Sequence, residues 1–258
     1  VSIVNGLKLL MYILDAKKGI IAIEDNKRDS ILIFEDLVAR KNSIEILGVK
    51  TKYPQGAEKQ LIYSCTKRIV PAGALPMAVG IVVHNAGTAS KIHYSLKFGL
   101  PLISRVVTVS GEGIQHSKNL EISIGTTFKD VIRFCGGFKG TPGKVIAGGP
   151  MMGFAQSSLE VPVIKGTSGI LIFPEDFTHI PVEDVCIRCG KCVDVCPMKL
   201  MPYKLGQLAE FGYFDEAEDW NAMDCMECGS CSYICPSNRR LIHYIKLLKA
   251  DILSKKKK

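Results

Sequence analysis

The chain has 258 residues, a length typical of about two domains. Hydrophobic residues make up 47% of it, as in an ordinary globular protein, and no apolar run approaches the ~18 residues that a membrane-spanning helix needs. The formal net charge is +8, and residues 255–258 form a run of lysines that we expect to be a solvated tail, with attraction to anionic lipid as the alternative. The other charges are mixed in sign and form no basic stripe interleaved with aromatics, which argues against a nucleic-acid partner.

The first hundred residues alternate between helical and strand-like patterns. We expect strands at 19–23, 44–49 and 79–83, and helices at 5–15, 27–40, 57–65 and from about 88 to 97. This order predicts an α/β domain over 1–100 with an open, mostly parallel sheet. Ligands of such sheets bind in loops after the strand ends, here 24–27, 52–58 and 84–88. Because Val1 is not a methionine and a helix begins almost at once, we expect the sequence to be a fragment that opens inside this domain.

A different pattern covers 101–178. It predicts strands at 105–110, 120–124, 144–147 and 167–173, with one helix at 127–135. Thr126 or Thr127 is the expected N-cap of that helix. Strand, strand, helix and strand in so short a segment suggest a small β-grasp-like module, followed by a polar linker.

The last part, 179–250, is predicted to be a helical domain with two cysteine runs of one pattern, followed by the basic tail at 251–258. Expected helices are 203–211, 214–220 and 237–253. Both runs read C-x2-C-x2-C-x3-C-P, a spacing typical of proteins with two [4Fe–4S] clusters. The first run contains Cys186, Cys189, Cys192 and Cys196, and the second contains Cys225, Cys228, Cys231 and Cys235.

The fourth cysteine of each run is expected to serve the other run's cluster. Three closely spaced cysteines can hold three corners of a cube, and in two-cluster ferredoxins the cysteine before proline ligates the second cluster. One cluster would therefore take the first three cysteines of the first run together with Cys235. The other would take the first three cysteines of the second run together with Cys196.

Two other uses of these cysteines fit less well. Zinc sites commonly use two C-x2-C knuckles for one ion and need neither the third cysteine nor the one before proline. A disulfide framework belongs to small secreted chains, whereas this chain is long and rich in aliphatic residues. Cys65 and Cys135 lie outside any ligand spacing and are expected to be buried small hydrophobic residues.

The whole chain resembles the C subunit of the Rnf electron-transport complex. The resemblance spans residues 1 to about 245 and includes both cysteine runs. Its further motifs are GIIAIEDNK at 19–27, TKYPQGAEKQ at 51–60, NAGT at 85–88, FCGGF at 134–138 and AGGPMMG at 147–153. A more distant resemblance, to the flavoprotein subunit of complex I, implies an FMN- and NADH-binding domain, an SLBB β-grasp module and a cluster-bearing helical domain.

This resemblance implies five flavin-binding residues. The flavoprotein of complex I has a Tyr-x-x-Gly-Glu-Glu loop and an Asn-Asn-Val-Glu-Thr turn at its flavin. Tyr53, Gly56 and Glu58 look like parts of the first, and Asn85 and Thr88 look like parts of the second. Ala57 and Gly87 replace acidic residues of that family, which puts contacts to nicotinamide or ribose in doubt. Without the resemblance, Asn85 and Thr88 could simply cap the helix that follows, and Tyr53 could be surface packing.

The function implied is electron transfer between NADH, through FMN, and ferredoxin or membrane partners, by way of two [4Fe–4S] clusters. Expected partners are other subunits of an Rnf-type ion-translocating complex and a ferredoxin, with peripheral attachment at the cytoplasmic face of the cell membrane. One alternative is a soluble Rnf-C-like reductase of the cobalamin reductase type. Another is a passive iron–sulfur wire or docking subunit without a nucleotide site.

Overall fold

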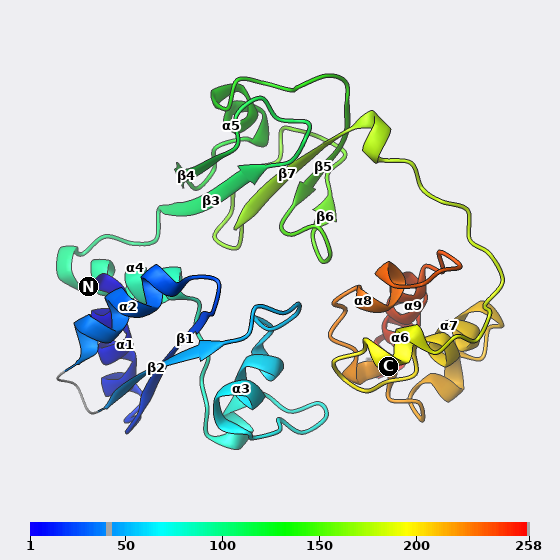
Figure 1. Cartoon of the computed structure of the whole chain (residues 1–258), viewed down its shortest axis with the longest axis horizontal. Coiled ribbons are helices and arrows are strands. Elements are labelled where there is room, and N and C mark those ends of the chain that lie inside the picture. The colour runs from blue at the N-terminus through cyan, green and yellow to red at the C-terminus, as the bar shows by residue number, and fades with distance from the viewer. Residues whose placement is uncertain (40–42, 257–258) are drawn as a thin grey trace. The chain divides into compact units, whose positions relative to one another are not determined.

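The chain divides into two compact units in a computed structural model that describes residues 1–39 and 43–256 (Figure 1). The first unit is Val1–Ile103 and the second is Ser104–Lys258. In the second unit a β-sheet module is followed by the helical segment that carries the cysteine runs. Within the described residues, no helix is both long and apolar enough to cross a membrane.

The first unit is built on a short β-α-β element. Its elements are α1 (Ser2–Ile13), β1 (Gly19–Glu24), α2 (Arg28–Val38), β2 (Ile44–Val49), α3 (Glu58–Thr66), a 3-10 helix (Pro76–Val79) and α4 (Ala86–Phe98). Strands β1 and β2 pair in parallel, with Gly19 opposite Ile44. Val4, Val38 and Ile44 are buried together between these strands and helices α1 and α2. The order therefore matches the predicted α/β pattern.

Helix α1 also packs against α4, and a glycine permits the approach. A Cβ atom on Gly6 would lie 1.8 Å from the carbonyl oxygen of Ala89. Any larger side chain at residue 6 would force the two helices apart, so this packing depends on the absence of a side chain.

The predicted strand at 79–83 is wrong. Pro76 begins a 3-10 helix that ends at Val79, and Gly80 then adopts a left-handed conformation with φ of 67°. Proline fixes its own φ and suits the first turn of a helix, so the chain turns here. The apolar residues that follow form no strand because they pair with neither β1 nor β2.

The β-sheet module of the second unit has a mixed sheet of five strands in the order β4-β3-β7-β5-β6 (Figure 1). These are β3 (Ser104–Ser110), β4 (Lys118–Ser123), β5 (Pro142–Ala147), β6 (Phe154–Ala155) and β7 (Gly169–Pro174). Strands β3 and β7 are parallel, and the other neighbouring pairs are antiparallel. Helix α5 (Phe128–Phe134) begins at the N-cap Thr127, whose hydroxyl accepts the Asp130 N–H. The module therefore has the β-grasp order that the sequence predicts, with the two-residue β6 as an addition.

The core of this module is aliphatic. Alternate residues of the parallel strands β3 and β7 point into it and are fully buried, as are residues on one face of α5. The buried side chains include Val107, Val109, Ile170, Ile172, Phe128, Val131 and Ile132. Every second residue is buried on the strands, and the buried residues of α5 have helical spacing. The sequence could therefore predict both the strands and the helix from its apolar residues.

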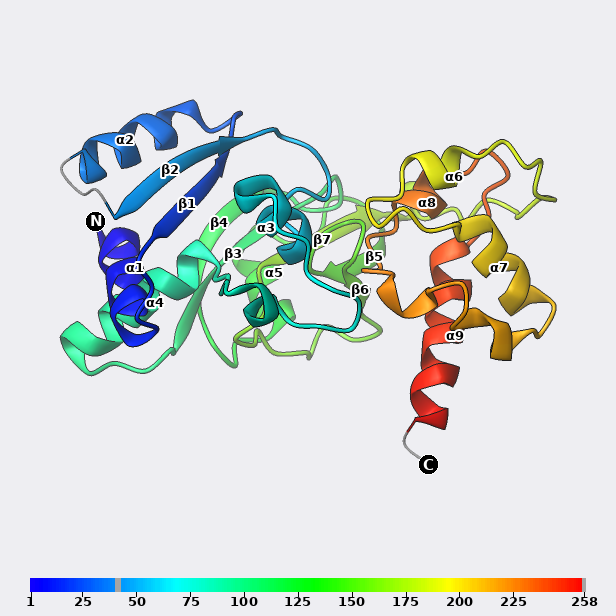
Figure 2. The same ribbon diagram turned by 90° about the horizontal axis from the view of Figure 1, so that it is seen from below.

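The cysteine-rich segment is helical. It contains α6 (Lys191–Asp194), α7 (Pro202–Glu210), 3-10 turns at Phe214–Ala217 and Ala222–Asp224, α8 (Ser230–Tyr233) and α9 (Leu241–Lys255). Helices α7 and α9 pack side by side (Figure 2). Leu205, Leu208, Ile245 and Leu248 are buried where they meet. The predicted helix at 214–220 is only a 3-10 turn, and α9 starts at Leu241 rather than 237 because Asn238 has a φ of 50°.

Candidate functional site

The two cysteine runs fold into the same backbone shape. In the first, Arg188 and Gly190 have φ values of 56° and 76°; in the second, Glu227 and Gly229 have values of 59° and 81°. Each run then enters a helix of one turn, α6 or α8. Left-handed residues alternating with ordinary ones make a concave backbone whose N–H groups face inward, a shape that suits an anionic centre.

Each run contributes cysteines to two cavities. The first cavity has a volume of about 230 Å³ and the second of about 20 Å³. The first is lined by Cys186, Cys189, Cys192 and Cys235. The second is lined by Cys225, Cys228, Cys231 and Cys196. The structure thus brings each triplet together with the cysteine that precedes proline in the opposite run.

The donor chemistry of both cavities suits iron–sulfur clusters. All ten cysteines lie in the described part of the chain, and no disulfide joins any of them. Among residues 1–39 and 43–256, no three His, Cys, Asp or Glu side chains converge closely enough to hold a single metal ion. Four cysteines around each cavity supply the number and type of ligand that a [4Fe–4S] cluster takes.

Backbone N–H groups point at the cysteine sulfurs. The N–H of Leu200 donates to Cys196 Sγ at 3.4 Å, and the N–H of Glu227 donates to Cys225 Sγ at the same distance. Such N–H···S hydrogen bonds favour the thiolate form and help to set cluster potentials. Both sulfurs belong to the second cavity.

Burial makes three of the cavity cysteines, Cys192, Cys225 and Cys231, poor thiolates without a cation. It raises the pKa of Cys192 and of Cys225, and it raises the pKa of Cys231 to about 12, with Cys225 and Cys228 adding to the effect. At neutral pH the thiols are therefore protonated when nothing balances their charge. Metal binding needs the thiolates and releases their protons, and the positive iron offsets the cost of burial.

Two partly buried cations near the cavities were not singled out from the sequence. Arg239 lines the first cavity. Lys249, on α9, donates to the carbonyl oxygen of Cys225 at 2.8 Å and pairs with Glu227 at 2.5 Å. A positive residue a few positions after the second Cys-Pro was the available signal for Arg239. The position of Lys249 near Cys225 depends on how α9 packs, which the sequence alone does not show.

Three of the predicted flavin residues lie after the carboxyl end of β2. Tyr53 is half-exposed, and a Cβ on Gly56 would meet open space. Glu58 is the first residue of α3. The loop before them is tied to the loop after β1, because Thr51 donates through its N–H and its hydroxyl to the Asp25 carboxylate at 3.0 and 2.7 Å. A loop in this position, with room beside it, fits a bound ligand.

The other two predicted residues, Asn85 and Thr88, lie at the start of α4. Asn85 is the N-cap, and its Oδ1 accepts the N–H of Gly87 at 2.8 Å. The capping interpretation of Asn85 is therefore what the structure shows, and its side-chain oxygen is used in the cap. Thr88 is in the first turn of the helix. Asn85 and Thr88 thus belong to a different element from Tyr53, Gly56 and Glu58.

The remaining cysteines behave as packing residues. Cys135 is fully buried in the β-sheet module, and Cys65 is partly buried on α3. Burial raises the pKa of both thiols. Neither lines the two cavities formed by the cysteine runs.

Fold and cavities together define a protein with an α/β domain, a β-grasp module and a helical domain suited to two iron–sulfur clusters. Three family models match the chain in that order: the Nuo51 FMN-binding domain at 1–94, the SLBB domain at 106–155 and the 4Fe-4S dicluster domain at 180–236. The chain belongs to the family of Rnf-complex C subunits, as the resemblance predicted.

Several curated relatives are named as C subunits of such complexes. The C subunit of the Na(+)-translocating ferredoxin:NAD(+) oxidoreductase complex of Acetobacterium woodii is 47% identical over 257 residues, which is 100% of this chain and 58% of the relative. The proton-translocating counterpart of Clostridium ljungdahlii is 48% identical over 251 residues, 97% of this chain and 55% of the relative. The C subunit of the ion-translocating oxidoreductase complex of Pseudomonas aeruginosa is 38% identical over 264 residues, 100% of this chain and 33% of the relative. The chain thus spans little more than half the length of the first two.

Proposed function

We propose that this chain is part of a C subunit that passes electrons between NADH and ferredoxin in an ion-translocating Rnf-type complex. The observation that carries this proposal is the pair of cavities, each with four cysteines drawn from both runs. When bound, FMN would convert a two-electron hydride into single electrons, and two [4Fe–4S] clusters would carry them one at a time.

The eight cysteines would hold the clusters. The first three of each run would supply three thiolates from one loop, and Cys196 and Cys235 would each cross to the other cavity. Pro197 and Pro236 fix the backbone just after these crossing ligands. The N–H groups of the left-handed turns would stabilise the negative charge of the thiolates.

The flavin would lie against the loop after β2. Tyr53 offers an aromatic face, Gly56 leaves room for close approach, and Glu58 offers a carboxylate at the start of α3. At the start of α4, Thr88 offers a hydroxyl, whereas Asn85 offers only the part of its amide that the cap does not use. NADH would bind beside the flavin in the same strand-end region.

The proposed partners rest on the names of the relatives. Relatives named as members of ferredoxin:NAD(+) oxidoreductase complexes support a ferredoxin and the other subunits of the complex as partners. We infer peripheral attachment through those subunits at the cytoplasmic face of the cell membrane. Purification with membrane subunits would separate this assignment from the soluble-reductase alternative.

Chemical analysis of the anaerobically purified chain tests the proposed function. We expect about eight iron and eight sulfide per chain, the content of two [4Fe–4S] clusters. In the whole C subunit we also expect bound FMN whose absorbance is bleached by NADH. Iron and sulfide without flavin or any response to NADH would support the passive-wire alternative. About one zinc per chain with no sulfide would end the cluster assignment.

The capping of α4 allows the two interpretations of Asn85 to be separated. Asn85→Ala should lower the free energy of unfolding by about 1 kcal/mol, because the Gly87 N–H loses its acceptor. Asn85→Ser keeps a capping hydroxyl and should restore most of that stability. If Asn85 also contacts FMN, both variants should bind FMN more weakly in a fluorescence titration. Normal FMN affinity in Asn85→Ser would restrict Asn85 to the cap.

A further inference from the structure

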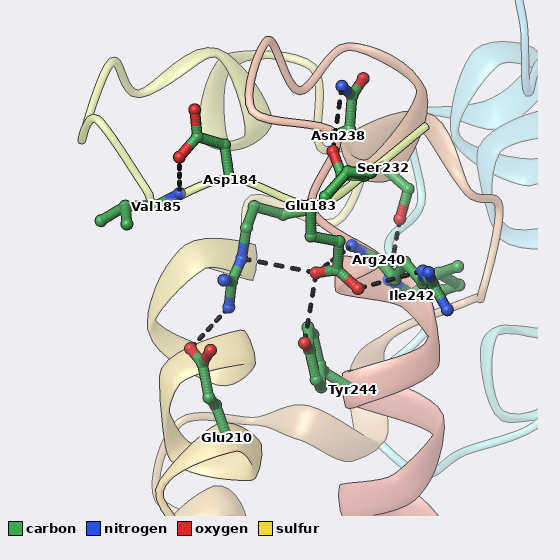
Figure 3. Close-up of polar contacts among 11 residues, drawn as sticks. Glu183, Asp184, Val185, Glu210, Ser232, Asn238, Arg240, Ile242 and Tyr244 are labelled. Carbon is green, nitrogen blue, oxygen red and sulfur yellow. Dashed lines mark hydrogen bonds and ion pairs between the residues drawn. The ribbon is translucent and has the colours of Figure 1, made fainter. Parts of the chain in front are cut away.

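The segment just before the first cysteine run is bound to the segment just after the second run (Figure 3). The N–H of Asp184 donates to the Ser237 carbonyl at 3.0 Å, and the Asn238 side chain donates to the Val182 carbonyl at 3.5 Å. Cys186 follows the first of these segments, and Cys235 precedes the second. These bonds therefore help to fix the distance between two cysteines of the first cavity that come from different runs.

Glu183 makes the strongest part of this connection. Its carboxylate pairs with Arg240 Nε at 3.0 Å and accepts hydrogen bonds from the Arg240 N–H and the Tyr244 hydroxyl, both at 3.2 Å (Figure 3). The Glu183 side chain is only 20% exposed. Charged groups that are partly buried and share several hydrogen bonds hold a fixed geometry better than exposed ion pairs.

Arg239 joins this carboxylate to a third element. Its Nη2 lies 2.5 Å from Glu210 Oε2 on α7, and its Nε lies 3.7 Å from Glu183 Oε2. The guanidinium also lies over the Tyr244 ring, 5.4 Å from the centroid. The side chain is 11% exposed. One planar guanidinium thus connects the segment before the first run, α7 and α9, a geometry that a lysine cannot reproduce.

Arg239 is also part of the wall of the first cavity, together with the four cysteines. Two guanidiniums, those of Arg188 and Arg239, line this wall and stay protonated, and Arg239 is the one held in ion pairs, with Glu183 and Glu210. In a partly buried site a nearby positive charge favours the reduced, more negative form of a cluster. Lys249 is bound to the Cys225 carbonyl beside the second cavity, but neither Lys249 nor Arg239 lines that cavity.

We propose that Arg239 is a positioning residue for the first cluster: it clamps the two runs around that cluster and raises its reduction potential relative to a chain without the guanidinium. This inference rests on the proposed cluster function. Arg239 lines the first cavity and not the second, so the potential of the first cluster can change without that of the other.

Redox titration followed by electron paramagnetic resonance tests this proposal in the whole chain. The signal of the first cluster is identified as the one lost in Cys192→Ser. We expect Arg239→Gln to shift the midpoint potential of that signal to a more negative value and to leave the other signal in place. Arg239→Lys keeps the positive charge but loses the planar guanidinium that joins the three elements. The first cluster of this variant should therefore keep a reduction potential near the original, but it should lose iron to a chelator several-fold faster. Arg133→Gln, on α5 of the β-sheet module, makes the same charge change at an exposed position and should do neither.

The possible outcomes separate the inference from the proposed function. Equal shifts of both signals, or no shift of either, in Arg239→Gln would overturn the inference. If Arg239→Gln fails to assemble the first cluster, the Arg239→Lys variant is used instead. Iron release faster than in Arg133→Gln would support the proposed role of Arg239 in holding the two runs together, and equal rates of release would overturn it. An unsubstituted chain without iron and sulfide would instead refute the proposed function itself.

Discussion

Cys235→Ser should abolish the same cluster as Cys192→Ser, although Cys235 belongs to the other run. The two cysteines share the first cavity, while Cys231, only four residues from Cys235, lines the second. Loss of one thiolate from a four-cysteine set removes or severely weakens that cluster. We therefore expect iron and sulfide to fall to about half, with the same paramagnetic signal missing in Cys235→Ser and Cys192→Ser.

Two further variants complete this test. Cys196→Ser should remove the signal that Cys231→Ser removes, since both line the second cavity. Cys65→Ser changes a cysteine of the first unit that lines neither cavity and should keep the full iron content. If each run instead held its own cluster, Cys235→Ser and Cys231→Ser would lose the same signal. That result would refute the assignment in which Cys196 and Cys235 each bind the cluster of the other run.

Leu248→Ala should destabilise the cysteine-rich domain by about 2–5 kcal/mol, the usual cost of emptying a buried leucine site. Leu248 is fully buried between α7 and α9, next to Leu205, Leu208 and Ile245. The same core packs against Cys196 and Cys225, so the cavity left behind should also loosen the second cluster. At a urea slope of about 1–3 kcal/mol per molar, the unfolding midpoint should fall by roughly 1 M or more.

The adjacent residue supplies the control. Leu247 lies on the same helix but its side chain is 52% exposed, so Leu247→Ala should change the midpoint little. Circular dichroism reports the helices and visible absorbance reports the clusters in the same titration. Equal effects of the two substitutions would mean that α9 is not held by the α7 contact.

The parts of the fold that local sequence determines were predictable. The strand at Ile44–Val49 was predicted with its bounds, and Thr127 is one of the two residues predicted to cap α5, because apolar runs and capping residues act over a few positions. The predicted strand at 79–83 failed because a strand needs a partner, which no local pattern reveals. The four-residue helices α6 and α8 are too short to show a helical period.

In the candidate site too, the residues set by local sequence were predictable and those set by distant contacts were not. Cysteine spacing is local, so all eight candidate ligands were predicted, and the structure gathers them in two sets of four. Arg239 was missed because its importance comes from Glu183 and Glu210, which lie 56 and 29 residues before it in the sequence and meet it only after folding. The flavin residues stay a prediction, since Asn85 acts visibly as a cap and Tyr53, Gly56 and Glu58 follow a different strand.

The interleaving of the two runs has a consequence for biosynthesis. Because each cavity is closed by a cysteine from the opposite run, the amino-terminal half of the domain lacks a ligand until the ribosome has made Cys235. Under the proposed ligation neither half would assemble a cluster alone, and a nascent chain stalled between the runs would expose all four cysteines of the first run to oxidation. Cofactor insertion would therefore follow synthesis of the whole cysteine-rich segment, and the domain would be loaded as one piece.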